Sequence, residues 1–157
     1  GLGDVYKRQI CNCLEELGSY YGDLTAHDGL WQAAIDTRDD LLGRLAVVPM
    51  VLEARGLDVT PNMIRLFEKA KLKNAVKALK TIYEEEVSHV AYGSKWFNFL
   101  CGRNNLDPKI EFHRLVTKYF NGFLKPPFNE EKRADAGLPP DFYWPLADQL
   151  NINTTYT

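Results

Sequence analysis

Residues 82–93 read IYEEEVSHVAYG, and within this stretch Glu86 and His89 fall on an otherwise apolar helical pattern. The pattern repeats at alternating spacings of four and three residues, which keeps its members on one face of a helix. Its members are Ala75, Leu79, Ile82, Glu86, His89, Gly93, Trp96 and Leu100. The spacing predicts one long helix over residues 73–101, with the Glu86 carboxylate and the His89 imidazole on its core-facing side.

A second carboxylate repeats this arrangement on an earlier helix. The apolar seam of that helix ends in a glutamate, through Leu42, Ala46, Pro49 and Glu53 at spacings of four, three and four. An unpaired carboxylate is costly to bury, so both glutamates require a compensating partner. Two carboxylates and an imidazole form an oxygen-and-nitrogen ligand set that suits iron or manganese. The sequence therefore predicts a metal site at Glu53, Glu86 and His89.

Two other interpretations of these residues stay open at this point. Lys95 or Arg55 can neutralise the carboxylates in place of a metal. Alternatively, Glu86 belongs to a solvated acidic run over residues 84–86, and His89 is a hydrogen-bonded core histidine. A Glu-x-x-His spacing occurs often by chance, so the metal hypothesis depends on the seam positions of its residues.

The remainder of the chain is also predicted to be helical, which makes the fold class all-α. Helices are expected over residues 10–17, 37–55, 60–71 and 107–123, with a short helical piece over 130–136. The loop formers of residues 19–31 predict an irregular segment, in which His27 is interpreted as a loop-ordering hydrogen-bond partner. His113, in the 107–123 helix, is interpreted as structural.

Local signals set the expected ends of these helices. Thr37 is predicted to cap the 37–55 helix, Pro49 to kink it and Gly56 to end it. Thr60 followed by Pro61 is typical of a helix start, because proline is tolerated in the first turn. The proline-rich stretch 125–145 predicts an extended arm pressed onto the helical body.

Composition narrows the classes of partner. The chain has 157 residues, the size of one domain, and its 19 basic and 21 acidic residues give a net charge of −2 without a basic block. Binding to nucleic acid is therefore not supported, and the longest apolar runs are too short to span a membrane. Cys11, Cys13 and Cys101 form no CxxC pair and are interpreted as reduced structural thiols of a cytoplasmic protein.

The two ends of the chain are expected to lie outside the domain. Residues 3–9, GDVYKRQ, can be back-translated into a transposon end that serves as a sequencing adapter, so residues 1–9 are interpreted as non-native. On this interpretation the domain covers residues 10–146, and the native protein extends further upstream. Residues 147–157 are expected to form a polar tail.

Several stretches resemble a family of the ferritin-like superfamily known as domain of unknown function 455. They are residues 22–31 (GDLTAHDGLW), 44–49 (RLAVVP), 52–58 (LEARGLD), 85–90 (EEVSHV), 96–97 (WF) and 127–129 (PFN). The resemblance covers most of the chain and implies a di-iron type of helical bundle. It carries the ligand role onto Glu53, Glu86 and His89. This chain departs from the family pattern at its N-terminus, where the first two ligand helices of the family are missing or truncated.

The function that this resemblance implies is a di-iron or iron–manganese oxidoreductase or hydroxylase in the full-length form, with an unidentified small-molecule substrate. A metal-storage or metal-sensing protein is the first alternative, and a non-catalytic helical interaction module is the second. The fragment is expected to hold an incomplete cluster. We also expect its uncovered ligand seam to favour a homodimer.

Overall fold

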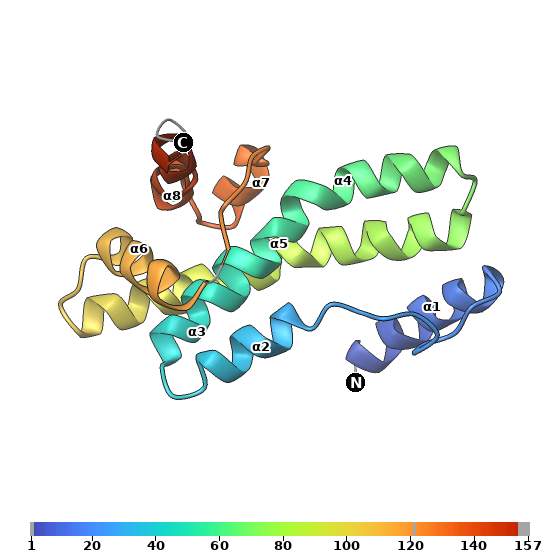
Figure 1. The fold of residues 1–157 in the computed structure, drawn as a ribbon, viewed down its shortest axis with the longest axis horizontal. Helices are drawn as coiled ribbons and strands as arrows, with labels where there is room; N and C mark the ends of the chain where they lie inside the picture. The colour runs from blue at the N-terminus through green and yellow to red at the C-terminus, as the bar shows by residue number, and fades with distance from the viewer. Residues whose placement is uncertain (1, 121, 154–157) are drawn as a thin grey trace.

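Helices form every regular element over residues 2–120 and 122–153, which are the residues that this computed structural model describes. The helices are α1 (Leu2–Glu16), α2 (Gly29–Asp36), α3 (Leu41–Val47), the π-helix η1 (Val48–Glu53), α4 (Ala54–Lys69), α5 (Lys73–Arg103), α6 (Pro108–Tyr119), α7 (Glu130–Asp135) and α8 (Pro140–Asn153). Figure 1 shows them coloured along the chain. The predicted all-α class is confirmed.

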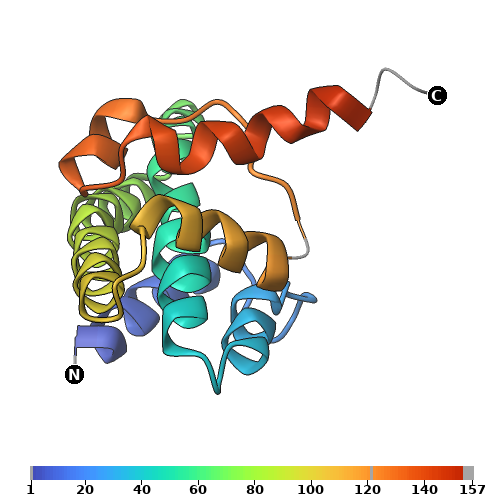
Figure 2. The same ribbon diagram turned by 90° about the vertical axis from the view of Figure 1, so that its left-hand side faces the viewer.

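A pair of long helical rods forms the centre of the molecule. One rod is the continuous run α3–η1–α4, and the other is α5, which returns antiparallel to it and contacts all three parts of the run (Figure 1). α1 lies beside the N-terminal half of α5. α6 crosses the other end of the pair, and α7 and α8 cover α6 and the middle of α5 (Figure 2). The core lies between α3, α5, α6 and α8.

The helix predicted over 37–55 begins later than expected. Thr37 ends α2 instead of starting a helix, because its hydroxyl donates to the Ala33 carbonyl at 2.6 Å. The N-cap of α3 is Asp40, whose carboxylate accepts from the Gly43 N–H at 2.8 Å. The predicted cap at Thr37 was therefore wrong, and so was the assignment of residues 29–31 to a loop.

The predicted helix end at Gly56 and helix start at Thr60 were also wrong, because α4 runs unbroken through both positions. Pro61 has no N–H to give to the Leu57 carbonyl one turn earlier. The side-chain amide of Asn129 donates to that carbonyl instead, at 3.2 Å. A partner 72 residues away thus lets α4 keep a proline in its interior.

The irregularity predicted at Pro49 takes the form of the π-helix η1. A π-helix is wider than an α-helix and is frequently found at functional sites. The Pro49 ring packs against Gly93 of α5, where an added Cβ would lie 2.5 Å from the ring carbons. Only a glycine lets the two rods approach this closely.

The proline-rich stretch is less extended than expected. Its short helical piece is present as α7, but α8 begins at Pro140 and continues through Pro145. His113 of α6 lies against the carbonyls that Pro145 disturbs, with Nε2 at 3.2 Å from the Asp141 oxygen and 2.9 Å from the Phe142 oxygen. The first residues of the predicted polar tail 147–157 are helical to Asn153, and residues 154–157 lie outside the described part of the chain.

Candidate metal centre

The structure brings the three predicted ligands together between the central rods. Glu53 is the last residue of η1, and Glu86 and His89 lie in the middle of α5. One ligand atom from each residue lies within 4.8 Å of the other two. A single cation of the size of Fe²⁺ or Mn²⁺ can therefore contact all three side chains after small rotamer changes.

Small residues let the two rods meet at this level. Gly56 of α4 faces Glu86, and a Cβ added there would lie 3.5 Å from the Glu86 Cγ. Gly93, one turn after His89, lies against the Pro49 ring. The lack of a side chain at Gly93 is what the close approach of the rods requires, whereas a Cβ at position 56 would make an ordinary van der Waals contact.

The site is partly open to solvent. The Glu86 side chain is 17% exposed, which excludes the interpretation that it belongs to a fully solvated acidic run. The His89 side chain is 54% exposed, so it is not a core histidine, and its predicted place on the buried side of α5 was wrong. α1 lies beside residues 74–81 of α5, a stretch that ends eight residues before His89.

The two carboxylates and the imidazole influence one another electrostatically. Burial raises the pKa of Glu53 above its usual value, the negative charge of Glu86 raises it further, and His89 opposes both effects. His89 Nδ1 lies 3.2 Å from a Glu86 carboxylate oxygen. Two carboxylates that share one half-buried space gain from a cation placed between them.

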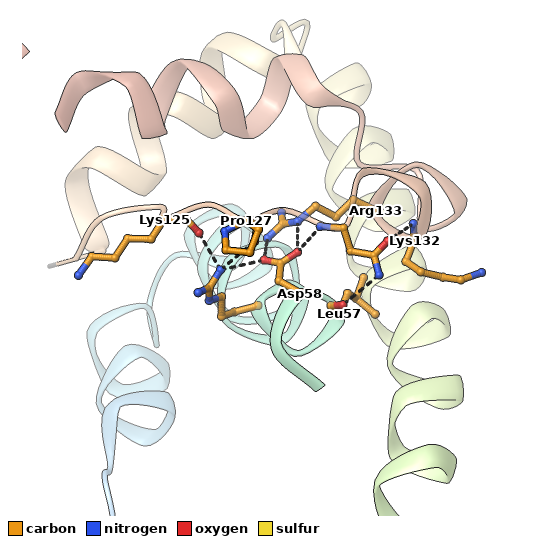
Figure 3. Close-up of polar contacts among 8 residues, drawn as sticks. Leu57, Asp58, Lys125, Pro127, Lys132 and Arg133 are labelled. Carbon is orange, nitrogen blue, oxygen red and sulfur yellow. Dashed lines mark hydrogen bonds and ion pairs between the residues drawn. The ribbon is translucent and has the colours of Figure 1, made fainter. Parts of the chain in front are cut away.

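The rival cations do not occupy this space. Arg55 donates to the Lys125 carbonyl at 2.7 Å and to the Pro127 carbonyl at 3.3 Å (Figure 3). Its ion pair, at 3.4 Å, is with Asp58 and not with Glu53 or Glu86. Lys95 is exposed to solvent. Within the described residues, the ion pair of Glu86 is with His89.

The metal-free protein should be more stable when Glu53 is replaced by Gln. A folded-state pKa raised above the usual 4.5 means that the folded chain binds the Glu53 proton more tightly than the unfolded chain. That stability is present at low pH and is lost as the pH rises through the folded pKa. Thermal melts in the presence of a chelator should show a higher Tm for Glu53→Gln at about pH 8, and a smaller difference at about pH 5. An equal or lower Tm at about pH 8 would contradict the electrostatic description.

Sequence reasoning missed a buried polar network next to the site. The Asp58 carboxylate accepts from Arg133 at 2.9 and 2.7 Å and from the Asn129 N–H at 2.9 Å (Figure 3). Arg133 also stacks on the rings of Phe128 and Tyr143. The position of Asp58, a carboxylate between Leu57 and Val59 and five residues after Glu53, was the available signal. The partner residues on α7 carry no comparable signal in the sequence.

Comparison with known proteins supports the family that the resemblance named, while its ferritin-like and di-iron parts stay predictions. The family profile described as protein of unknown function (DUF455) matches residues 7–144. The chain belongs to the DUF455 family. An uncharacterised protein of Haemophilus influenzae is 40% identical to this DUF455 chain over 125 residues, which is 80% of the chain and 43% of the relative. The chain therefore spans less than half the length of this curated relative. No solved structure matches it.

Among the residues that the structure describes, each helix is too short or too polar to span a bilayer.

Proposed function

We propose that Glu53, Glu86 and His89 bind an iron or manganese ion, and that DUF455 proteins containing this unit are ferritin-like di-metal oxidoreductases. The observation that carries the proposal is the convergence of the three ligand atoms within 4.8 Å. Glu53 lies on one helix, 33 residues before Glu86 and 36 before His89 on the other, so local spacing does not explain their meeting. This convergence supports the metal hypothesis over the interaction-module alternative.

The donor set fits the proposed metal. Carboxylate and imidazole ligands are those that non-haem iron and manganese proteins use. The raised pKa of Glu53 shows that the site disfavours its own negative charge, and a bound cation removes this cost. Protons must leave the ligands on binding, so affinity should fall at low pH.

The proposal of a second metal ion rests on the number and type of ligand residues that this chain supplies. Di-metal carboxylate bundles use a lone Glu from each of two helices and a Glu-x-x-His from each of two others. This chain supplies one of each kind, Glu53 and the Glu86–His89 pair, on two adjoining helices. In our proposal, further helices of a longer protein supply the second half. Such a centre, when loaded, activates dioxygen, and hydroxylation of a small substrate is the reaction that superfamily analogy favours.

Metal binding can be measured directly on this chain. Titration with Mn²⁺, followed by electron paramagnetic resonance, should show one saturable site. Glu86→Gln and His89→Ala should each weaken binding by more than about 100-fold, because they remove a ligand and not a neighbouring group. Glu84→Gln is the matched control, since Glu84 lies on the same helix, is exposed and is absent from the cluster. Absence of a saturable site in the unsubstituted chain, or equal weakening by Glu84→Gln, would overturn the proposal.

Oxygen consumption separates an oxidoreductase from a storage protein. The test uses the longer Haemophilus influenzae relative loaded with Fe²⁺ and supplied with a reductant. Sustained consumption beyond the amount of iron added supports an oxidoreductase. If consumption stops after an amount of oxygen proportional to the added iron, the storage alternative is supported.

A further inference from the structure

The side chain of Asn129 lies between the two helices that carry the proposed ligands. Its amide nitrogen donates one hydrogen to the Leu57 carbonyl of α4 at 3.2 Å and the other to the Tyr83 hydroxyl of α5 at 2.9 Å. Leu57 is four residues after Glu53, and Tyr83 is three residues before Glu86. Both contacts are therefore one helical turn from a ligand.

We infer that Asn129 is a positioning residue for the metal centre, which sets the separation of α4 and α5 at the level of the ligands. This inference rests on the proposed metal binding at Glu53, Glu86 and His89. Asn129 comes from the segment before α7, outside both ligand helices. It thus acts on the centre through Leu57 and Tyr83 and does not itself bind the metal.

The Leu57 carbonyl accepts from Asn129 because of Pro61. In an uninterrupted α-helix the N–H of residue 61 would occupy this carbonyl, but proline has no N–H. The sequence thus provides a free acceptor on α4 at the position where Asn129 reaches it. Helix propensity disfavours a proline inside a helix more strongly than any other residue, so an interior proline requires such compensation.

Asn129 is held in a single orientation. Its backbone N–H donates to Asp58 at 2.9 Å, and its side-chain oxygen accepts from the Lys132 N–H at 3.2 Å. Asp58 is in turn fixed by Arg133, as Figure 3 shows. A reversed amide would place an oxygen against the Leu57 carbonyl, so the contacts themselves define the orientation.

The three proposed ligands lie between two contacts that join the rods: the hydrogen bonds of Asn129 on one side, and a steric contact on the other. Pro49, four residues before Glu53, packs against Gly93, four residues after His89. Asn129 joins the rods on the opposite side of the ligands, about two helical turns from the contact between Pro49 and Gly93. Two fixed contacts on either side of a site hold its side chains at a defined separation, which is what a metal centre requires.

Two variants test the inference with Mn²⁺ alone as the probe. Asn129→Ser keeps a side-chain oxygen for the α7 N-cap but is too short to bridge Leu57 and Tyr83. Tyr83→Phe removes only the hydroxyl that accepts from Asn129. Each should weaken Mn²⁺ binding by about 10-fold and alter the resonance spectrum of the metal-saturated protein, since neighbouring groups that orient ligands typically contribute 10–100-fold. The double variant should be little weaker than either single variant, because both act through one contact.

Trp144→Phe is the matched control for stability. It removes another hydrogen bond of the C-terminal arm, from the indole N–H of α8 to Glu130 of α7 at 2.8 Å, and neither of these residues belongs to α4 or α5. Affinity and spectrum should be unchanged in this control, even if its Tm falls.

The outcomes separate this inference from the function on which it rests. If the unsubstituted chain binds Mn²⁺ and Glu86→Gln does not, the centre exists. Unchanged affinity and spectrum in both Asn129→Ser and Tyr83→Phe then overturn only the positioning role. If Glu86→Gln binds Mn²⁺ as well as the unsubstituted chain does, the proposed function fails and the positioning role fails with it.

Discussion

Replacing Asp58 with Ala is expected to lower the free energy of unfolding by about 3–5 kcal/mol, the cost of leaving one member of a buried ion pair without its partner. The Asp58 side chain is 0% exposed and that of Arg133 is 3% exposed. Removing the carboxylate leaves the guanidinium buried without a counter-charge and the Asn129 N–H without its acceptor. Denaturation with urea, analysed at constant m, measures this loss.

A neighbouring ion pair supplies the control for this prediction. Lys132 pairs with Asp135 at 2.8 Å on the same short helix, and both side chains are substantially exposed. Lys132→Met should therefore cost no more than about 1 kcal/mol. Replacing Asp58 and Arg133 together with apolar residues should recover part of the loss, since no charge then stays unpaired. Equal effects of Asp58→Ala and Lys132→Met would show that the network contributes no more than an exposed pair.

Replacing Gly93 with Ala should destabilise the protein by about 1–3 kcal/mol and weaken Mn²⁺ binding, although alanine normally favours a helix. The new Cβ would lie 2.5 Å from both Cβ and Cγ of Pro49, and a proline ring cannot rotate away. η1 must then move from α5, which carries Glu53 away from Glu86 and His89. Urea denaturation and Mn²⁺ titration measure the two effects.

Gly102, on the same helix, is the matched position for this substitution. An added Cβ there meets nothing within 4 Å, so Gly102→Ala should be neutral or stabilise by up to about 1 kcal/mol. The two substitutions are therefore expected to differ in sign. If Gly93→Ala is as well tolerated as Gly102→Ala, then the contact with Pro49 does not control the separation of the rods.

Strong periodicity and local caps predicted the elements that depend on local sequence. The 73–101 helix was confirmed as α5, because its apolar pattern extends over about seven turns, from Ala75 to Leu100. Gly18 follows the end of α1 with a φ of +74°, which is typical of a helix stop, and Asp107 caps α6 through the N–H groups of Lys109 and Ile110. These signals are complete within a few residues, so distant parts of the chain do not override them.

The errors concern positions where a distant partner replaces a local one. Pro61 and Pro145 both predicted breaks, yet both lie inside helices. Their freed carbonyls lie against Asn129 and His113, which no pattern within a few residues could reveal. Tertiary contacts of this kind routinely override local preference.

The candidate site was predictable because its residues lie on the periodic apolar patterns that also predicted the helices. Seam positions identified Glu53, Glu86 and His89, and the structure places them together, while their binding of metal stays a prediction. The exposure of His89 was not predictable, because a periodic pattern identifies one face of α5 but not which parts of that face other helices cover. The positioning contacts of Asn129 depend on the path of the chain after α6 and were equally beyond the sequence patterns.

The proline inside α4 has a consequence for the order in which the chain folds as it is synthesised. Leu57 leaves the ribosome 72 residues before Asn129, the residue that donates to its carbonyl. Over that interval α4 can form, but its Leu57 carbonyl must remain bonded to water, because Pro61 offers no hydrogen. The helix completes its hydrogen bonding only when the segment leading into α7 arrives, so a segment that is synthesised much later finishes a helix begun long before it.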